Sequence, residues 1–197
     1  MPTVDEILSR WLPHYTHRQF AEEVRALSTH GEKWLYRPGQ PAQLWQGDVL
    51  PDLPFLSVGS NEEVSVAVSW GLIISNTCDL VIGQDEYAVI VPIISFAEHL
   101  QANPMAEKTL TSFHQSLREN IVSRYFYLPA SGRLPESFAD FSRPTAIELP
   151  VLYERLAATA LTDHLSLSLK GHLLLLMKLA YHVARPETPD VTRAADS

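Results

Sequence analysis

The sequence predicts an α+β fold in which a small β-barrel, or a strongly bent sheet, is framed by helices. Stretches with helical spacing open the chain, a β-rich middle third with short connections follows, and further helical stretches close it. Hydrophobic residues make up 46% of the 197 residues, which is enough for a core. Because the few strands do not alternate regularly with single helices, a doubly wound parallel sheet is disfavoured.

Two helices are predicted over residues 2–30. Thr3 and Glu6 have the spacing of a capping box, in which two side chains satisfy free backbone amides at a helix start. Thr16 and Gln19 repeat this spacing. Apolar residues follow each box at helical intervals, so we expect an N-terminal helical hairpin.

The pattern divides the chain into three parts. The helical hairpin is expected over residues 1–33, the barrel domain with its inserted and C-terminal helices over residues 34–185, and a flexible tail over residues 186–197. Prolines and glycines become frequent from Pro38, which marks the change from helices to turns and strands.

The middle third carries the strand patterns. Residues 44–50 are expected to form the first strand, and residues 64–69 alternate Val with Ser or Ala, the period-two pattern of a half-buried strand. Residues 71–74 continue with apolar side chains on both faces. Residues 87–94 form a further strand, which Pro92 interrupts near its end.

The remainder of the chain mixes both patterns. Leu110, Phe113, Leu117 and Ile121 have helical spacing and predict a helix. Short strands and then two closing helices are expected after it, at residues 125–128, 138–141, 145–149, 151–160 and 166–185.

The last predicted helix contains four consecutive leucines, Leu173–Leu176. This run is too apolar for one face of a solvent-exposed helix. We expect it in a buried closing helix or, in part, in the interface of a homodimer.

The charge distribution favours some partners over others. The net charge is −8, and no Lys or Arg occurs between Pro38 and Glu107. Nucleic acid is bound mainly through Lys and Arg contacts to its phosphates. The sequence therefore disfavours nucleic acid at the barrel and favours a protein partner with a basic or neutral surface.

The single cysteine excludes an internal disulfide framework and a cysteine-based zinc cluster, so a cytoplasmic protein is expected. His14 and His17 are spaced like two metal ligands but lack a third, and neither a metal nor another cofactor is expected. No apolar run is long enough to cross a bilayer, so no membrane partner is expected.

Several short segments carry a family resemblance by their order. They are Gln46–Val49, Gly71–Asn76, Tyr87–Ile93, Tyr127–Pro129 and Arg155–Ala157. In this order they resemble the MazF/PemK toxin family, which are ribonucleases built on an SH3-like barrel. The resemblance covers roughly residues 44–180. It implies an SH3-like barrel and a bacterial toxin–antitoxin-like or phage-defence setting.

One departure concerns the chemistry of that family. Its strand before the Ser-Asn turn begins with an Arg-Pro pair, whose arginine serves RNA cleavage, whereas this chain has Ser69–Gly71 there. A second catalytic Thr or Ser of the family would fall near Asp85 or Glu86. An indole or a carboxylate cannot stabilise the charge of a phosphorane. The resemblance therefore implies a divergent barrel protein that acts through protein contacts.

The expected binding face combines a strand-end turn with neighbouring residues. Small polar side chains at such a turn bond local backbone groups and can also line a surface. Trp70 ends an alternating strand, which favours its exposure. The candidate binding residues are Asp48, Trp70, Ser75, Asn76, Thr77 and Asp79.

Two enzymatic alternatives remain open. An active, metal-independent endoribonuclease would need a relocated cation, Arg37 or Arg124, beside Thr77 or Ser75. Its guanidinium group should lie within about 4–6 Å of Thr77, where opposite charges interact strongly.

A Cys78-dependent enzyme is the other alternative. It would need a histidine within hydrogen-bond reach of the thiol. Asp79 is adjacent in the sequence and disfavours the reactive thiolate. The candidate catalytic residues are thus Thr77, Cys78 and Arg124.

Overall fold

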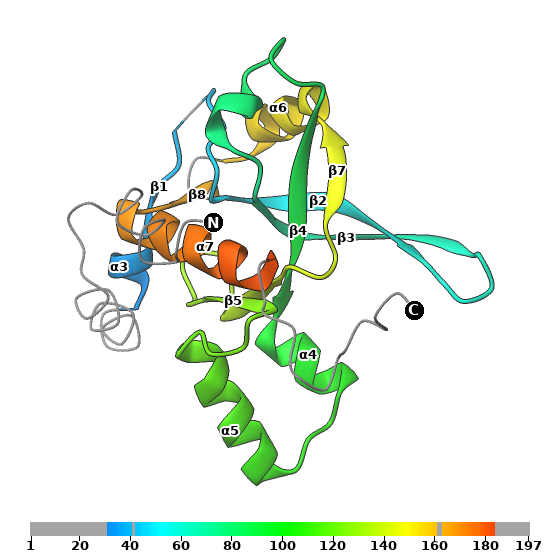
Figure 1. Cartoon of the computed structure of the whole chain (residues 1–197), viewed down its shortest axis with the longest axis vertical. Helices are drawn as coiled ribbons and strands as arrows, with labels where there is room; N and C mark the ends of the chain where they lie inside the picture. Colours follow the sequence, from blue (N-terminus) through cyan, green and yellow to red (C-terminus); the bar gives the residue numbers. More distant parts are fainter. Residues whose placement is uncertain (1–30, 41, 161–162, 184–197) are drawn as a thin grey trace, which may run out of the picture.

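The computed structural model describes residues 31–40, 42–160 and 163–183 (Figure 1). The predicted hairpin, with His14 and His17, therefore lies outside the described residues except for its last three positions, and so does the predicted tail. The described residues form an α+β protein with one eight-stranded antiparallel sheet and five α-helices.

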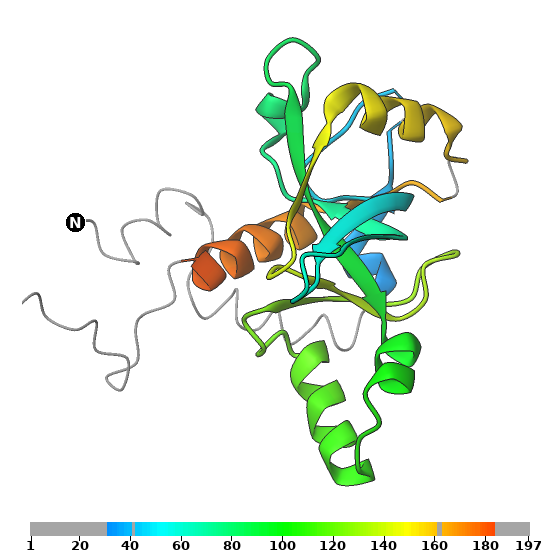
Figure 2. The same cartoon turned by 90° about the vertical axis from the view of Figure 1, so that its right-hand side faces the viewer.

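The strands of the sheet are β1 (Tyr36–Pro38), β2 (Asp48–Val58), β3 (Val64–Ile73), β4 (Tyr87–Ser95), β5 (Tyr125–Leu128), β6 (Ser137–Asp140), β7 (Thr145–Glu148) and β8 (Leu165–Leu167). The helices are α3 (Glu32–Leu35), α4 (Phe96–Ala102), α5 (Glu107–Arg118), α6 (Leu149–Ala158) and α7 (Leu169–Val183), with a 3-10 turn η1 (Thr77–Leu80). Helix α6 and the α4–α5 pair lie at opposite ends of the sheet (Figure 2).

The sheet is not closed into a barrel, which corrects the predicted closure. Its strand order is β1-β8-β2-β3-β4-β6-β5, and β7 pairs with β4. Side chains, rather than a backbone ladder, bridge the two ends of the sheet. The Tyr36 hydroxyl donates to the carbonyl of Pro129 at 3.0 Å, and Ser131 donates to Glu32 at 2.7 Å. These two contacts bring the ends of the sheet near one another, but no strand pairing joins β1 to β5.

The inner halves of the central strands are buried on both faces. Successive strand residues point to opposite sides. Val49 and Leu72 pack in a core with α7, whereas Leu50 and Ile73 pack in a second core under α6. The prediction of two apolar faces at residues 71–74 is therefore confirmed for Gly71–Ile73, which are buried, while Ile74 is half-buried.

The outer halves of β2 and β3 form a hairpin that extends from the body (Figure 1). We call residues 54–68 the arm. The strand expected at residues 64–69 is confirmed, but its predicted half-burial is wrong, because Val64, Val66 and Val68 are 61%, 61% and 66% exposed. Strand β2 begins at Asp48, later than expected. It continues through Pro51 and Pro54, because it pairs with β8 only at Asp48 and Val49 and the rest of that edge needs no backbone donors.

Other predicted elements shift by a few residues, and several were missed, among them α3, β1, η1 and α4. Strand β4 runs through Pro92 without a break. Strand β8 occupies positions where a helix was expected, and α4 was not predicted. The leucine run Leu173–Leu176 is partly buried in α7, where Leu174 and Leu175 belong to the core. No helix within the described ranges is long and apolar enough to cross a membrane.

Helix α7 also carries a buried lysine. The Lys178 ammonium donates to the carbonyls of Asn120 at 2.8 Å and Val122 at 2.6 Å. Only 7% of the residue is exposed. Burial lowers the pKa of Lys178 from its ordinary value of 10.5 to about 8. The lysine thus ties α7 to the segment that leads into β5, at the cost of desolvating its charge.

This burial predicts a pH-dependent stability. Between about 8 and 10.5 the unfolded chain binds the lysine proton and the folded protein releases it, so the free energy of unfolding rises with pH. We expect a gain of up to about 3 kcal/mol over this window. Urea unfolding at about pH 7.5 and 9.5 should show this rise in the wild type and in the exposed control Lys108→Met. The rise should be absent in Lys178→Met; an equal slope in all three proteins would contradict the prediction.

Candidate functional site

A buried carboxylate lies where β2 begins. Asp48 is 0% exposed and accepts a hydrogen bond from the Trp45 amide at 2.9 Å. It also accepts from His164 Nε2 at 3.0 Å and from the Ser166 hydroxyl. An ionised carboxyl group only accepts, so His164 Nε2 carries the proton. We call Asp48, His164 and Ser166 the Asp48 cluster; it joins β2 to β8 and the segment preceding it.

The imidazole of the Asp48 cluster is sealed from solvent. His164 is 1% exposed, and its Nδ1 has no hydrogen-bond partner. A Cβ added to Gly39 would lie 2.3 Å from the ring, so only glycine permits this packing. An aspartate–histidine pair can serve as a general base. Here the burial of the pair makes it a structural tie between strands.

A second set of hydrogen bonds surrounds Gln46. Its amide N–H donates to Thr77 Oγ1 at 3.1 Å, and its side-chain Nε2 donates to the carbonyl of Ile74 at 2.8 Å. Gln46 Oε1 must therefore accept from His172 Nε2, at 3.0 Å. This bond leaves His172 Nδ1 as the acceptor of the neutral ring. Gln46, Thr77 and His172 form the Gln46 cluster.

Arg37 lies beside the Gln46 cluster. Its guanidinium group is 5.4 Å from the centre of the Trp45 ring, a cation–π distance. Burial, and secondly the charge of Arg37, lower the pKa of His172. His172 is therefore neutral at pH 7 and presents an acceptor nitrogen close to a cation. This arrangement can bind an anion or assist a proton transfer.

The polar residues of the predicted turn mostly bond backbone groups, but only Asn76 bonds local backbone as expected. Ser75 Oγ accepts from the Val89 amide at 2.7 Å, and Asn76 Oδ1 accepts from the Cys78 amide at 3.1 Å, which caps η1. Thr77 faces Gln46. Asp79 is exposed. The turn and the start of β2 thus meet, whereas Asp48 is buried beneath the surface.

Trp70 lies apart from this turn. It is half-buried against the core with α7 and lines a hollow of about 240 Å³. Among the other candidate residues of the expected binding face, none lines this hollow. The structure therefore does not gather the six predicted residues into one face.

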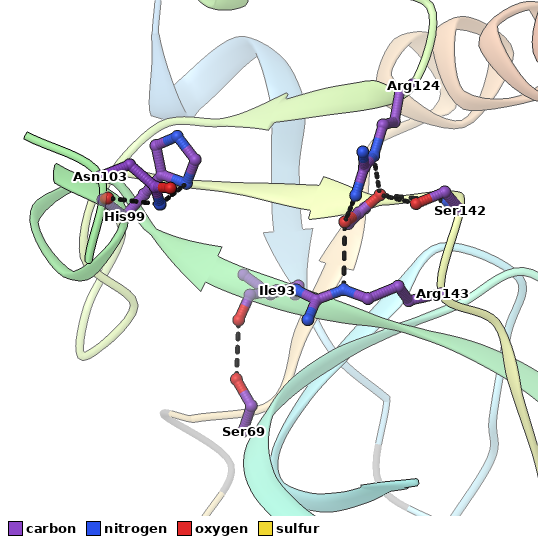
Figure 3. Close-up of polar contacts among 8 residues, drawn as sticks. Ser69, Ile93, His99, Asn103, Arg124, Ser142 and Arg143 are labelled. Carbon is purple, nitrogen blue, oxygen red and sulfur yellow. Dashed lines mark hydrogen bonds and ion pairs between the residues drawn. The ribbon is translucent and has the colours of Figure 1, made fainter. Parts of the chain in front are cut away.

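Arg124 is held by a carboxylate that sequence reasoning missed. Its Nε and Nη2 donate to Asp140 at 2.8 and 2.7 Å (Figure 3). Arg143 donates to the same carboxylate at 3.1 Å. Arg124 is therefore engaged at the end of β6, and Arg37 is the arginine beside the Gln46 cluster. No sequence pattern indicates this pairing, because Arg124 and Asp140 lie 16 positions apart, just before β5 and at the end of β6.

Cys78 is exposed. No histidine of the described segments forms a hydrogen bond with its thiol, so these segments supply no activating base. In the same segments, no group of three His, Cys, Asp or Glu side chains could hold a metal ion.

Comparison of the chain with protein-family models and with curated proteins found no match in either case. The resemblance to the MazF/PemK family therefore stays a prediction.

The Asp48 cluster predicts a large stability effect. In Asp48→Asn the new amide would place N–H groups against the donors of His164 or Ser166. We expect a loss of about 1–3 kcal/mol in the free energy of unfolding, the cost of leaving a buried donor without its acceptor. Asp52→Asn is the matched control, because Asp52 is exposed on the same strand and its left-handed φ of 57° suits Asn equally. Urea unfolding should shift the control by less than about 0.5 kcal/mol, and similar losses in both variants would contradict the assignment.

Proposed function

We propose that this protein is a divergent, non-catalytic member of the MazF/PemK-like group that acts through protein contacts, in a bacterial toxin–antitoxin-like or phage-defence setting. Its sheet would be an opened SH3-like barrel, whose ends are bridged by the contact of Tyr36 with Pro129. The observation that carries the proposal is the exposed apolar face of the arm.

The apolar face of the arm consists of side chains that pair across β2 and β3. The pairs are Pro54 with Val68, Leu56 with Val66, and Val58 with Val64. Except for Pro54, which is half-buried, these side chains are 58% to 69% exposed. The residues between them are Ser57, Ser65 and Ala67 on the opposite face, beside the buried Phe55. The large apolar side chains that are exposed on the arm therefore all lie on one face.

An exposed apolar surface of this kind is unfavourable in water unless another surface covers it. A two-stranded ribbon alone is marginally stable in water, and contiguous exposed apolar residues mark interaction sites. The outer edges of the arm also lack partner strands within the described ranges. Strand β2 pairs with β8 only at Asp48 and Val49, and β3 pairs with β4 only over Trp70–Ile73. An extended segment can therefore dock on the face or add to an edge.

The charges around the arm select the occupant. Asp52 lies near its base and Glu62 and Glu63 at its tip, and no Lys or Arg occurs between Pro38 and Glu107. A second arm would bring carboxylates against carboxylates. The occupant that fits is a segment of another protein with apolar residues on one side and Lys or Arg at its ends.

The proposal predicts face-specific cross-linking in the native cell. A photo-cross-linking amino acid at position 66 should capture a partner protein, whereas the same group at position 65 should not, since the two side chains point to opposite faces. Mass spectrometry of the cross-linked peptide should identify alternating apolar residues flanked by Lys or Arg. Cross-links mainly to copies of this chain, or equal yields from both positions, would reject the proposed partner.

The captured segment then allows a quantitative control. Leu56→Gln combined with Val66→Thr should weaken its binding at least about tenfold, because each buried apolar side chain contributes about 1.5–3 kcal/mol. Ser57→Thr combined with Ser65→Thr alters the opposite face and should leave binding unchanged.

A metal-independent endoribonuclease is the second candidate. The position of Arg37 beside the neutral His172 and the Gln46–Thr77 contact favours it, because these groups could stabilise charge and accept a proton.

An RNA-cleavage assay without metal separates the two functions. The leading proposal predicts no cleavage by the wild type. If the wild type cleaves RNA, Arg37→Gln should reduce the rate at least about 100-fold, as expected for loss of a group that stabilises transition-state charge. Arg133→Gln is the control, because Arg133 is exposed and paired with Asp163 instead. Cleavage that depends on Arg37 would replace the leading proposal.

A further inference from the structure

Two arginines converge on one buried carboxylate at the end of β6. Asp140 is 1% exposed, and its oxygens accept from Arg124, Arg143, the Ser142 amide and the Ser142 hydroxyl (Figure 3). Arg124 Nη2 and Arg143 Nε share the same oxygen, at 2.7 and 3.1 Å. These two nitrogens cannot be farther apart than the sum of these distances, so the two guanidinium groups are neighbours.

The backbone fixes both arginines in place. Tyr125 pairs with Asp140 across β5 and β6, and the Phe141 amide donates to the carbonyl of Arg124 at 3.0 Å. The Arg143 amide donates to the carbonyl of Asp140 at 3.3 Å. The Arg124 guanidinium group also lies 5.1 Å from the centre of the Tyr125 ring. Little side-chain entropy therefore remains to be lost when a ligand binds.

The arginine pair keeps unused charge and unused donors. One carboxylate balances one guanidinium group, so the cluster has an excess charge of about +1 by simple count. The side chains of Arg124 and Arg143 are 46% and 54% exposed. Within the described segments, Arg143 uses only its Nε and Arg124 only its Nε and Nη2. The remaining N–H groups can reach a ligand at the surface.

We propose that Arg124 and Arg143 together bind the phosphate group of a small phosphorylated compound. This site is separate from the arm and from the Gln46 cluster, so a test of phosphate binding does not depend on the proposed function.

The geometry favours phosphate over carboxylate. Phosphate offers more acceptor oxygens and more negative charge than a carboxylate, so it can use more of the free N–H groups of two neighbouring guanidinium groups at once. The charge of Arg124 also reaches His99, because burial and secondly Arg124 lower the pKa of His99, while Asp140 acts in the opposite direction.

The net charge of the protein favours a small ligand over a nucleic acid. The chain carries −8, which repels a long polyanion. A compound with one phosphate group contacts only the local positive site, and its binding should be saturable.

The experiment titrates the full chain with inorganic phosphate and, separately, with a nucleoside 5′-monophosphate by calorimetry. We expect saturable binding with one site. Arg143→Gln should weaken it at least about tenfold, as for loss of one charge-assisted hydrogen bond. The matched control is Arg133→Gln, which removes the same charge from an arginine that is 76% exposed and paired with Asp163. The control should change affinity by less than about twofold.

Two further measurements test whether the Arg143 variant is folded and whether the site prefers phosphate to carboxylate. Arg143→Gln should keep the free energy of unfolding, measured in urea, within about 0.5 kcal/mol of the wild type, because Arg124 and Ser142 still hold Asp140. Acetate should bind at least about tenfold more weakly than phosphate. Absence of saturable phosphate binding, equal losses in both arginine variants, or tighter binding of a single-stranded oligonucleotide than of the monophosphate would each overturn the proposal.

Discussion

The described fold depends on one buried carboxylate at the start of β2. Asp48 takes donors from its own turn and from two residues, His164 and Ser166, that lie more than a hundred positions later. These bonds fix β8 against β2 and set the position of Gln46, which in turn orients Thr77 and His172. A buried charge is tolerated only when its acceptors are satisfied. The order of the strands at this edge therefore depends on the completeness of this cluster.

The same anchor explains why the arm leaves the body. Strand β2 is held at its first residues, and the pairing register shifts between Leu50 and Leu53, where Asp52 has a left-handed φ. Within the part of the chain that the structure describes, β2 pairs beyond this irregularity only with β3, and the face that carries Leu56 and Val66 is exposed. The arm and the Arg124–Arg143 pair thus belong to one continuous sheet, in which β3, β4 and β6 connect them.

Local chemistry was predictable from the sequence, and long-range geometry was not. The capping contact of Asn76 could be predicted, because Asn at a turn often bonds the backbone two residues on, whereas the partner of Ser75 lies on another strand. Alternating valines at residues 64–68 predicted a strand, but alternation cannot tell whether anything covers the apolar face. Sheet closure, the role of His164 and the pairing of Arg124 with Asp140 depend on contacts between distant residues, which periodicity does not encode.

Amide hydrogen exchange across the arm directly tests whether this ribbon is a surface for another protein. In the isolated chain at low concentration, the outward-facing amides of residues 54–68 should exchange rapidly, while those of Val49 and Leu72 in the body stay protected. In the complex purified with its cellular partner, protection should appear along the arm. Strong protection of the arm in the isolated chain, or exchange that is unchanged in the complex, would contradict the account.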